Sequence, residues 1–317
     1  MSAKTDLDLS RSIKTKGEAL GFDLIGICPA EYSPESHERL LQWLRRGFHA
    51  DLAYLERNPR MRSDARLFFP GAKSVISVAK SYYIESNYDP AKPYISIYAR
   101  CRPYQDIIKA KLGALLEYIK SLAPETRGKI AVDTSPTFDR YWANRAGLGW
   151  PGKNTMLINK RFGSFLFLGE LFVDIDIEPD KPEIDRCGDC SRCIEACPSG
   201  ALVEPRVLDA SKCISYLTTA TDIDSERASR IGGNILGCEI CQLVCPYNQN
   251  AEPSDSRGEM FTDIDFNNLA LKDYIDLTES RFDDTFKGTI IAQKGFYKFR
   301  HNTLVAQYNT SAFRGLS

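Results

Sequence analysis

Residues 187–198 read CGDCSRCIEACP, with cysteines at positions 187, 190, 193 and 197 and a proline directly after the last one. A second run, CEICQLVCP at residues 238–246, repeats this ending with one cysteine fewer, and Cys213 lies between the two runs. Of the ten cysteines, only Cys28 and Cys101 lie outside this region. Thiols clustered so tightly in a chain of ordinary composition predict metal ligands rather than disulfides.

The spacing C-x2-C-x2-C-x3-C-P is typical of bacterial ferredoxins, in which the fourth cysteine of a run ligates the other cluster. This crossing rule predicts two [4Fe–4S] sites with no clustered thiol left over. One site takes Cys187, Cys190, Cys193 and Cys245, and the other takes Cys197, Cys213, Cys238 and Cys241. Zinc is the alternative, but zinc sites pair C-x2-C knuckles across a longer gap, so the four-cysteine run favours iron.

The composition excludes several classes of protein. The 317 residues carry 41 basic and 42 acidic side chains and are 43% hydrophobic, which is typical of a globular protein and not of a disordered or globally basic one. The length allows about two domains. No apolar run reaches the roughly 18 residues of a membrane span, and residues 1–17 lack the apolar stretch of a secretory signal. We therefore expect a cytoplasmic protein with no membrane segment.

Patterns of apolar residues predict an α+β protein whose first domain is α/β-like. Helical spacing covers residues 9–21, 104–121 and 136–149, and apolar runs predict strands near residues 22–27, 75–83, 129–133 and 164–177. The acidic, proline-containing stretch 173–185 reads as a linker. We expect a first domain at 1–178, a ferredoxin-like two-cluster module at 179–250, and a short helical segment at 251–317 that packs on the first domain.

Two loops of the first domain carry candidate chemistry. Asp133 follows a predicted strand, where a carboxyl can serve as an acid or can cap the helix that starts near Pro136. Residues 147–154, GLGWPGKN, nearly match a phosphate-binding loop, but Asn154 replaces the Ser or Thr and a helix precedes the loop. A helix end followed by a turn, or a close approach of backbone to a large planar ligand, explains these glycines better.

Basic residues gather beside aromatic ones in three stretches, although the net charge is close to zero. Such pairs suit phosphate contacts and base stacking on RNA, whereas solvated helix faces are the simpler explanation for any one cluster. The stretches contain Arg57, Arg60, Arg62 and Arg66 beside Tyr54; Arg100 and Arg102 beside Tyr98 and Tyr104; and Lys294, Lys298 and Arg300 beside Phe296, Tyr297 and Phe299.

Over most of its length the chain resembles the epoxyqueuosine reductases, which are cobalamin and iron–sulfur enzymes of tRNA queuosine synthesis. The resemblance rests on MRSDARLFFPGAKSVI, ISIYAR, VDTSPTFDRYWANRAGLGWPGKNTMLI, GSFLFLGEL, both cysteine runs, CISYLT and FRHNTLVAQYN. It implies reduction of epoxyqueuosine to queuosine at the wobble position of tRNAs with GUN anticodons. Cobalamin would be the reactive centre, and the two clusters would be the electron path.

The resemblance also implies site residues. Asp133 matches the proton donor of the family and lies near the corrin, and the other matched cobalamin contacts are Arg62, Ser96, Leu157, Leu168 and Ser215. The family continues YAR with glycine and then Asp-Tyr-His, whereas this chain has Cys101, Pro103, Tyr104 and Gln105 at the corresponding places. The histidines are His37, His49 and His301, and none lies in an Asp-x-His-x-x-Gly pattern, so we expect no protein imidazole on cobalt.

Three other functions compete with this prediction. A reductive dehalogenase-like enzyme would also pair cobalamin with two clusters, but those enzymes usually carry export signals. A bare two-cluster ferredoxin would show iron–sulfur absorbance without corrin bands, and a cobalamin chaperone would not need eight clustered cysteines. We expect a monomer that acts on the anticodon loop of tRNA and receives electrons from a donor that the sequence does not identify.

Overall fold

The computed structural model describes residues 3–85, 88–89, 92–221, 223–253, 257–266 and 269–314. Its largest sheet has four strands in the order β1-β2-β7-β4, and every neighbouring pair is antiparallel. These strands are β1 (Leu24–Pro29), β2 (Ser74–Ser81), β4 (Gly128–Ala131) and β7 (Leu166–Val173). The alternation of helices and strands in the sequence had left a parallel sheet open. The antiparallel pairing makes the fold α+β.

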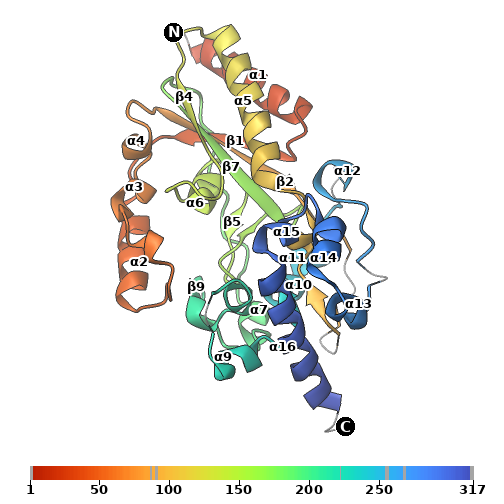
Figure 1. The fold of residues 1–317 in the computed structure, drawn as a ribbon. Coiled ribbons are helices and arrows are strands. Elements are labelled where there is room, and N and C mark those ends of the chain that lie inside the picture. Colours follow the sequence, from red (N-terminus) through yellow and green to blue (C-terminus); the bar gives the residue numbers. More distant parts are fainter. Residues whose placement is uncertain are drawn as a thin grey trace.

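The two central strands are buried along their whole length, because helices cover both faces of the sheet (Figure 1). Ile76 and Val78 of β2 point into a core formed with helices α1 (Ala3–Ala19) and α5 (Tyr104–Leu122). Val75 and Ala79 point to the opposite face, where Trp142 of α6 (Asp139–Arg145) fills the second core. This alternation is the period-two pattern of a strand between two layers.

The predicted strands and helices of this part are confirmed, with shorter limits in two places. The helix predicted at 136–149 begins only at Asp139, and the strand expected over 164–177 is the single strand β7. The helices that flank the second core face are α2 (Pro34–Arg45), α3 (Pro59–Ser63) and α4 (Ala65–Phe68). Three two-residue strands complete this half of the chain, namely β3 (Tyr94–Ile95), β5 (Trp150–Pro151) and β6 (Leu157–Ile158).

The cysteine-rich region lies at one end of the sheet and is built from short elements (Figure 1). They are α7 (Arg192–Glu195), β8 (Leu202–Glu204), β9 (Val207–Leu208), α8 (Ile214–Leu217), α9 (Ser225–Arg230), β10 (Asn234–Leu236), α10 (Ile240–Leu243) and α11 (Pro246–Gln249). Pro246 is the first residue of α11, where a missing backbone N–H costs nothing. β10 pairs in parallel with β3, which ties this region to the first half of the chain.

The C-terminal segment is helical, as predicted. It comprises α12 (Arg257–Met260), α13 (Leu271–Ile275), α14 (Glu279–Phe286), α15 (Ile290–Lys294) and α16 (Phe296–Arg314). Phe282, Phe286 and Phe299 form its core, and Asn302 of α16 donates to the carbonyl oxygens of Thr218 and Ile235. The segment therefore contacts the cysteine-rich region as well as the turn at residues 97–100. No helix among the described residues is both long and apolar enough to cross a membrane.

Candidate functional site

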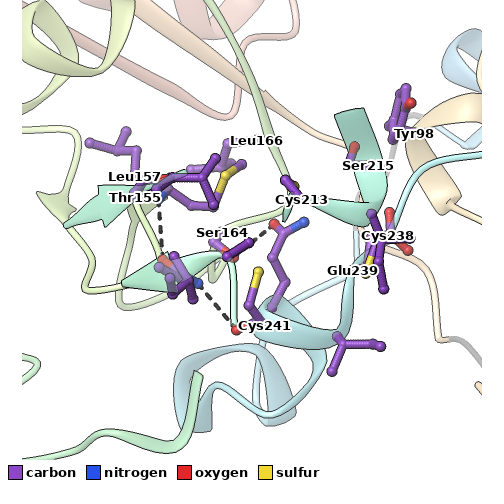
Figure 2. Close-up of a pocket in the computed structure, with 18 of the residues that line it drawn as sticks. Tyr98, Thr155, Leu157, Ser164, Leu166, Cys213, Ser215, Cys238, Glu239 and Cys241 are labelled. Carbon is purple, nitrogen blue, oxygen red and sulfur yellow. Dashed lines mark hydrogen bonds between the residues drawn. The ribbon is translucent and has the colours of Figure 1, made fainter. Parts of the chain in front are cut away.

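A cavity of about 390 Å³ lies where the end of the large sheet meets the cysteine-rich region. Its walls come from segments that are far apart in the sequence, and Figure 2 shows Leu157 and Leu166 on one side of it and Cys213, Ser215 and Cys238 on the other. The ionisable lining residues other than cysteines are Tyr82, Tyr98, Tyr104, Asp133, Asp139, Arg140 and Glu239. A concave apolar site with few polar groups is the usual form of a small-molecule site.

Asp133 lies at the edge of this cavity, two residues after β4 ends. Its φ of 54° is in the left-handed region, which a residue other than glycine adopts at some cost. The Asp133 carboxylate accepts a hydrogen bond of 2.9 Å from the Gln105 side-chain amide. The capping interpretation of Asp133 is wrong, because α6 begins at Asp139 and Phe138 is the residue that precedes it.

Tyr104 lies beside Asp133 at the start of α5 and is held by stacking. Its ring lies on that of Phe167, with centroids 3.7 Å apart and planes within 5° of parallel. Burial raises the pKa of the Tyr104 hydroxyl, and the adjacent Asp133 carboxylate, to which the hydroxyl is hydrogen-bonded, raises it further. The phenol therefore stays protonated and donates to Asp133 at neutral pH.

The cysteines fall into two groups of neighbours. Burial raises the pKa of the Cys245 thiol, and the nearby Cys187 and Cys190 thiols raise it further. Burial also raises the pKa of the Cys193 thiol, and the nearby Cys187 and Cys245 thiols contribute to that rise. This group consists of the four residues that the crossing rule placed together.

The second group lines the cavity. Burial raises the pKa of the Cys238 thiol to about 12, and Cys213 and Cys197 are its thiol neighbours. The pKa of the Cys241 thiol is also raised by burial and then by Cys238, Cys213 and Cys197. Cys197, Cys213, Cys238 and Cys241 all line the cavity.

The two groups are looser than a site for a single ion. Among the residues that the structure describes, no three His, Cys, Asp or Glu side chains converge closely enough to chelate one metal ion. Four cysteine thiolates are the donor set that an iron–sulfur cube takes.

Four of the six predicted cobalamin contacts lie together at the cavity, and two do not. Asp133, Leu157, Leu168 and Ser215 are lining residues. The buried Arg62 side chain instead donates to the backbone carbonyl of Tyr54, and Ser96 is buried outside the lining. The Ser96 hydroxyl has no hydrogen-bond partner, and it lies where a side chain on Gly237 would be.

The glycine-rich segment 147–154 connects the sheet to the cysteine-rich region. Lys153 donates 2.6 Å to the carbonyl of Gly188, and Asn154 donates 3.2 Å to the carbonyl of Cys241. Gly149 has no room for a side chain, since a Cβ there would lie 2.3 Å from the carbonyl oxygen of Ile158. The lysine that a phosphate loop would offer to a nucleotide is thus bonded to protein backbone, as the missing Ser or Thr had indicated.

The histidines lie elsewhere in the fold. His37 is 3.3 Å from the Ser63 hydroxyl, His49 is 2.9 Å from Glu56, and His301 is exposed on α16. None of the described lining residues of the cavity is a histidine.

Several residues in the lining or bonded to it had no functional prediction from the sequence. Tyr98 and Tyr104 stood out only as aromatic neighbours of arginines, and Gln105 only as a departure from the family pattern. Glu239 gave no signal beyond its place between two cysteines. It is buried and accepts 2.7 Å from the Tyr94 hydroxyl with one oxygen, while its other oxygen has no partner.

Exposed basic residues remain candidates for contacts with a polyanion. Arg57 and Arg60 are exposed, and Arg140 is exposed at the cavity itself, where it donates to the carbonyl of Thr155. Arg62 and Arg100 are different, because both side chains are buried.

Comparisons with known proteins agree with this arrangement. A family model described as "4Fe-4S double cluster binding domain" matches residues 186–248, and one described as "Epoxyqueuosine reductase QueG, DUF1730" matches residues 62–134. The epoxyqueuosine reductase of Leadbetterella byssophila is 40% identical over 298 residues, which are 93% of this chain and 97% of that protein.

Solved structures give the same result. A crystal structure of epoxyqueuosine reductase with a tRNA-Tyr epoxyqueuosine-modified tRNA stem loop has a TM-score of 0.83 at 27% identity and covers 96% of this chain and 82% of that one. The Bacillus subtilis enzyme, solved with the loop of its catalytic aspartate swung out of the active site, has a TM-score of 0.79 at 28% identity, with the same coverage. A catabolic reductive dehalogenase, at a TM-score of 0.50 and 18% identity, shares the fold alone. The chain therefore belongs to the epoxyqueuosine reductase family and is an oxidoreductase.

Proposed function

We propose that this chain reduces epoxyqueuosine to queuosine at the wobble position of tRNAs with GUN anticodons, with cobalamin in the cavity and two [4Fe–4S] clusters as the electron path. One observation carries the proposal: Asp133 and the four cysteines of the second group line the same cavity. Opening an epoxide to an alkene consumes two electrons and two protons and releases water. The cavity thus brings a proton donor and an electron source to one place.

The ligand sets follow the two groups of neighbouring thiols. Cys187, Cys190, Cys193 and Cys245 would hold the outer cluster, and Cys197, Cys213, Cys238 and Cys241 the inner one. In support, each thiol with a resolved pKa shift has thiols of its own set among the groups that raise its pKa, and Cys193 of the other set contributes to Cys241 only after them. Cys190 is exposed and Cys241 lines the cavity, so we propose that electrons enter through the outer set.

The cavity has the chemistry to hold a corrin. Leu157, Leu166 and Leu168 provide an apolar wall, and the free oxygen of Glu239 and the residue Ser215 provide polar groups opposite. Bound cobalamin would supply a strongly nucleophilic metal centre that accepts electrons one at a time. Since no described lining residue is a histidine, the chain offers cobalt no imidazole from this wall.

The protein side chains supply position and protons. Asp133 would donate its acidic proton to the oxygen of the opening epoxide, and exposure of its loop lets solvent replace that proton. The Tyr104 hydroxyl and the Gln105 amide hold the carboxyl at the cavity. A wobble base would have to leave its stack to reach this depth, which costs little for an unpaired loop nucleotide.

The tRNA would lie over exposed arginines, namely Arg140 at the cavity and Arg57 and Arg60 in the segment at α3. The support is twofold: a relative of the same fold was solved with an epoxyqueuosine-modified stem loop, and these cations are exposed. We further propose that the protein acts as a cytoplasmic monomer, with the domain limits 1–178, 179–250 and 251–317. We propose no specific electron donor for it.

The test is anaerobic reconstitution with iron, sulfide and cobalamin, followed by incubation with tRNA from a strain that accumulates epoxyqueuosine. Nucleosides are then quantified by mass spectrometry. We expect conversion to queuosine only when iron, cobalamin and a reductant are all present. Conversion that persists without cobalamin would refute the cofactor assignment, and no conversion by a fully loaded protein would refute the activity.

A further inference from the structure

The Asp133 carboxyl sits on an exposed loop, yet two side chains of one helix hold it. The Asp133 backbone has a φ of 54°, so its conformation depends on contacts outside the loop. Both contacts come from the first two residues of α5, Tyr104 and Gln105. Tyr104 is itself fixed by stacking on Phe167 of the central strand β7. The sheet therefore fixes the position of the Asp133 carboxyl through α5.

In this arrangement only the donor end of the Gln105 side-chain amide makes a hydrogen bond. Its Nε2 donates 2.9 Å to Asp133 Oδ2, while its Oε1 is buried and has no partner. A buried acceptor without a donor is uncommon and calls for an explanation. An ionised carboxylate can only accept, so it needs the donor end of the amide. A protonated carboxylic acid carries an O–H that needs an acceptor instead.

We propose that Gln105 is the positioning residue of Asp133 and holds it in both protonation states. Its Nε2 donates to the carboxylate, and after the amide turns over, its Oε1 accepts from the protonated acid. In the proposed reaction the Asp133 O–H bond breaks as an O–H bond forms on the epoxide oxygen, and the amide turns to meet the new carboxylate. Gln105 neither gains nor loses a proton. The inference rests on the proposed function only for this last step.

An amide at this place has a consequence for pH dependence. The other titratable groups around Asp133 are Tyr104 on α5 and Asp139 and Arg140 on α6, with Tyr82, Tyr98 and Glu239 deeper in the cavity. Gln105 contributes no titration of its own. An imidazole could also donate to Asp133, but it would add a charge change between pH 5 and 8.

The experiment compares Gln105→Met, Gln105→His and the wild-type holoenzyme, with Asp106→Asn as a matched control on the exposed face of α5. We expect Gln105→Met to lower kcat roughly 10- to 100-fold with less than a threefold change in KM, since a misplaced acid costs about this much. Gln105→His should recover kcat to within about fivefold of wild type and add a limb to the pH profile with a midpoint near 6.5. Asp106→Asn should leave kcat unchanged.

Hydrogen exchange of residues 132–138 gives a readout that does not depend on turnover. Loss of the hydrogen bond between residue 105 and Asp133 should speed hydrogen exchange of this loop at least threefold in Gln105→Met and not in Gln105→His. Cluster absorbance and melting temperature should be unchanged in both variants. Equal exchange and equal kcat in Gln105→Met and wild type would overturn the inference. If the wild type converts no epoxyqueuosine, the proposed function fails, while the exchange data still decide whether Gln105 holds the loop.

Discussion

Asn248 is the buried side chain that joins the cavity wall to the second cysteine run, and replacing it tests how that junction is held. Its Oδ1 accepts 2.6 Å from the backbone N–H of Ser164, and its Nδ2 donates 2.7 Å to the carbonyl of Gln242 and 2.9 Å to the Ser164 hydroxyl. Asn248→Leu keeps a similar volume but leaves the backbone N–H of Ser164 buried without a partner, whereas the Gln242 carbonyl still accepts from the backbone N–H of Cys245. One buried unpaired group costs about 1–3 kcal/mol, so we expect a loss of that size.

The assay is anaerobic calorimetry of the holoprotein, together with its iron content. For a domain of this size, 1 kcal/mol corresponds to roughly 2–4 °C in Tm, so Asn248→Leu should lower Tm by at least about 2 °C. Gln249→Leu, one residue away and exposed, should change Tm by less than about 1 °C, as surface changes do. If Asn248→Leu melts with the wild type at equal iron content, these three hydrogen bonds do not hold the junction, and the reasoning is wrong.

Three further changes give separate tests. Asp133→Asn keeps an acceptor for the Gln105 amide but loses the acid, so single turnover by mass spectrometry should slow by about 10²- to 10⁴-fold with unchanged iron content; near-normal turnover would exclude the acid role. Gly149→Ala places a Cβ 2.3 Å from a carbonyl oxygen and should lower Tm, whereas Gly113→Ala in open space on α5 should raise it slightly; the opposite order would contradict the packing. Burial raises the pKa of Glu170 well above its ordinary 4.5, so its stability contribution is full below that value and falls as pH rises through the folded pKa. Glu170→Gln should therefore gain Tm over wild type increasingly above pH 4.5, and a pH-independent difference would show that Glu170 is ionised in the fold.

Some parts of the fold were predictable because their signals are local. The apolar run of β2 and the helical spacing in α5 were confirmed within a few residues, since burial on one or two faces fixes them. The direction of strand pairing was not predictable from these patterns, because β2 and β7 lie far apart in the sequence and are buried on both faces like parallel strands.

The candidate site divides in the same way. The cysteine runs carry their chemistry in their spacing, and a 4Fe-4S double cluster family model matches residues 186–248, while the division of the thiols into two ligand sets stays a prediction. Gln105 and Glu239 were not predictable, because an amide or a carboxyl acquires a role only from what the fold places against it. The capping prediction for Asp133 failed for a related reason: the loop before α6 continues to Phe138, and no residue type in the sequence marks that extension.

The exposure of one thiol in the first group has a consequence for inactivation of the enzyme by oxygen. Cys190 is open to solvent, while Cys241 forms part of the cavity wall. Once both clusters are loaded, dissolved oxygen meets the outer one first. Oxidation of that cluster would stop electron transfer to the cavity. A partly oxidised molecule would then bind tRNA without reducing its epoxyqueuosine.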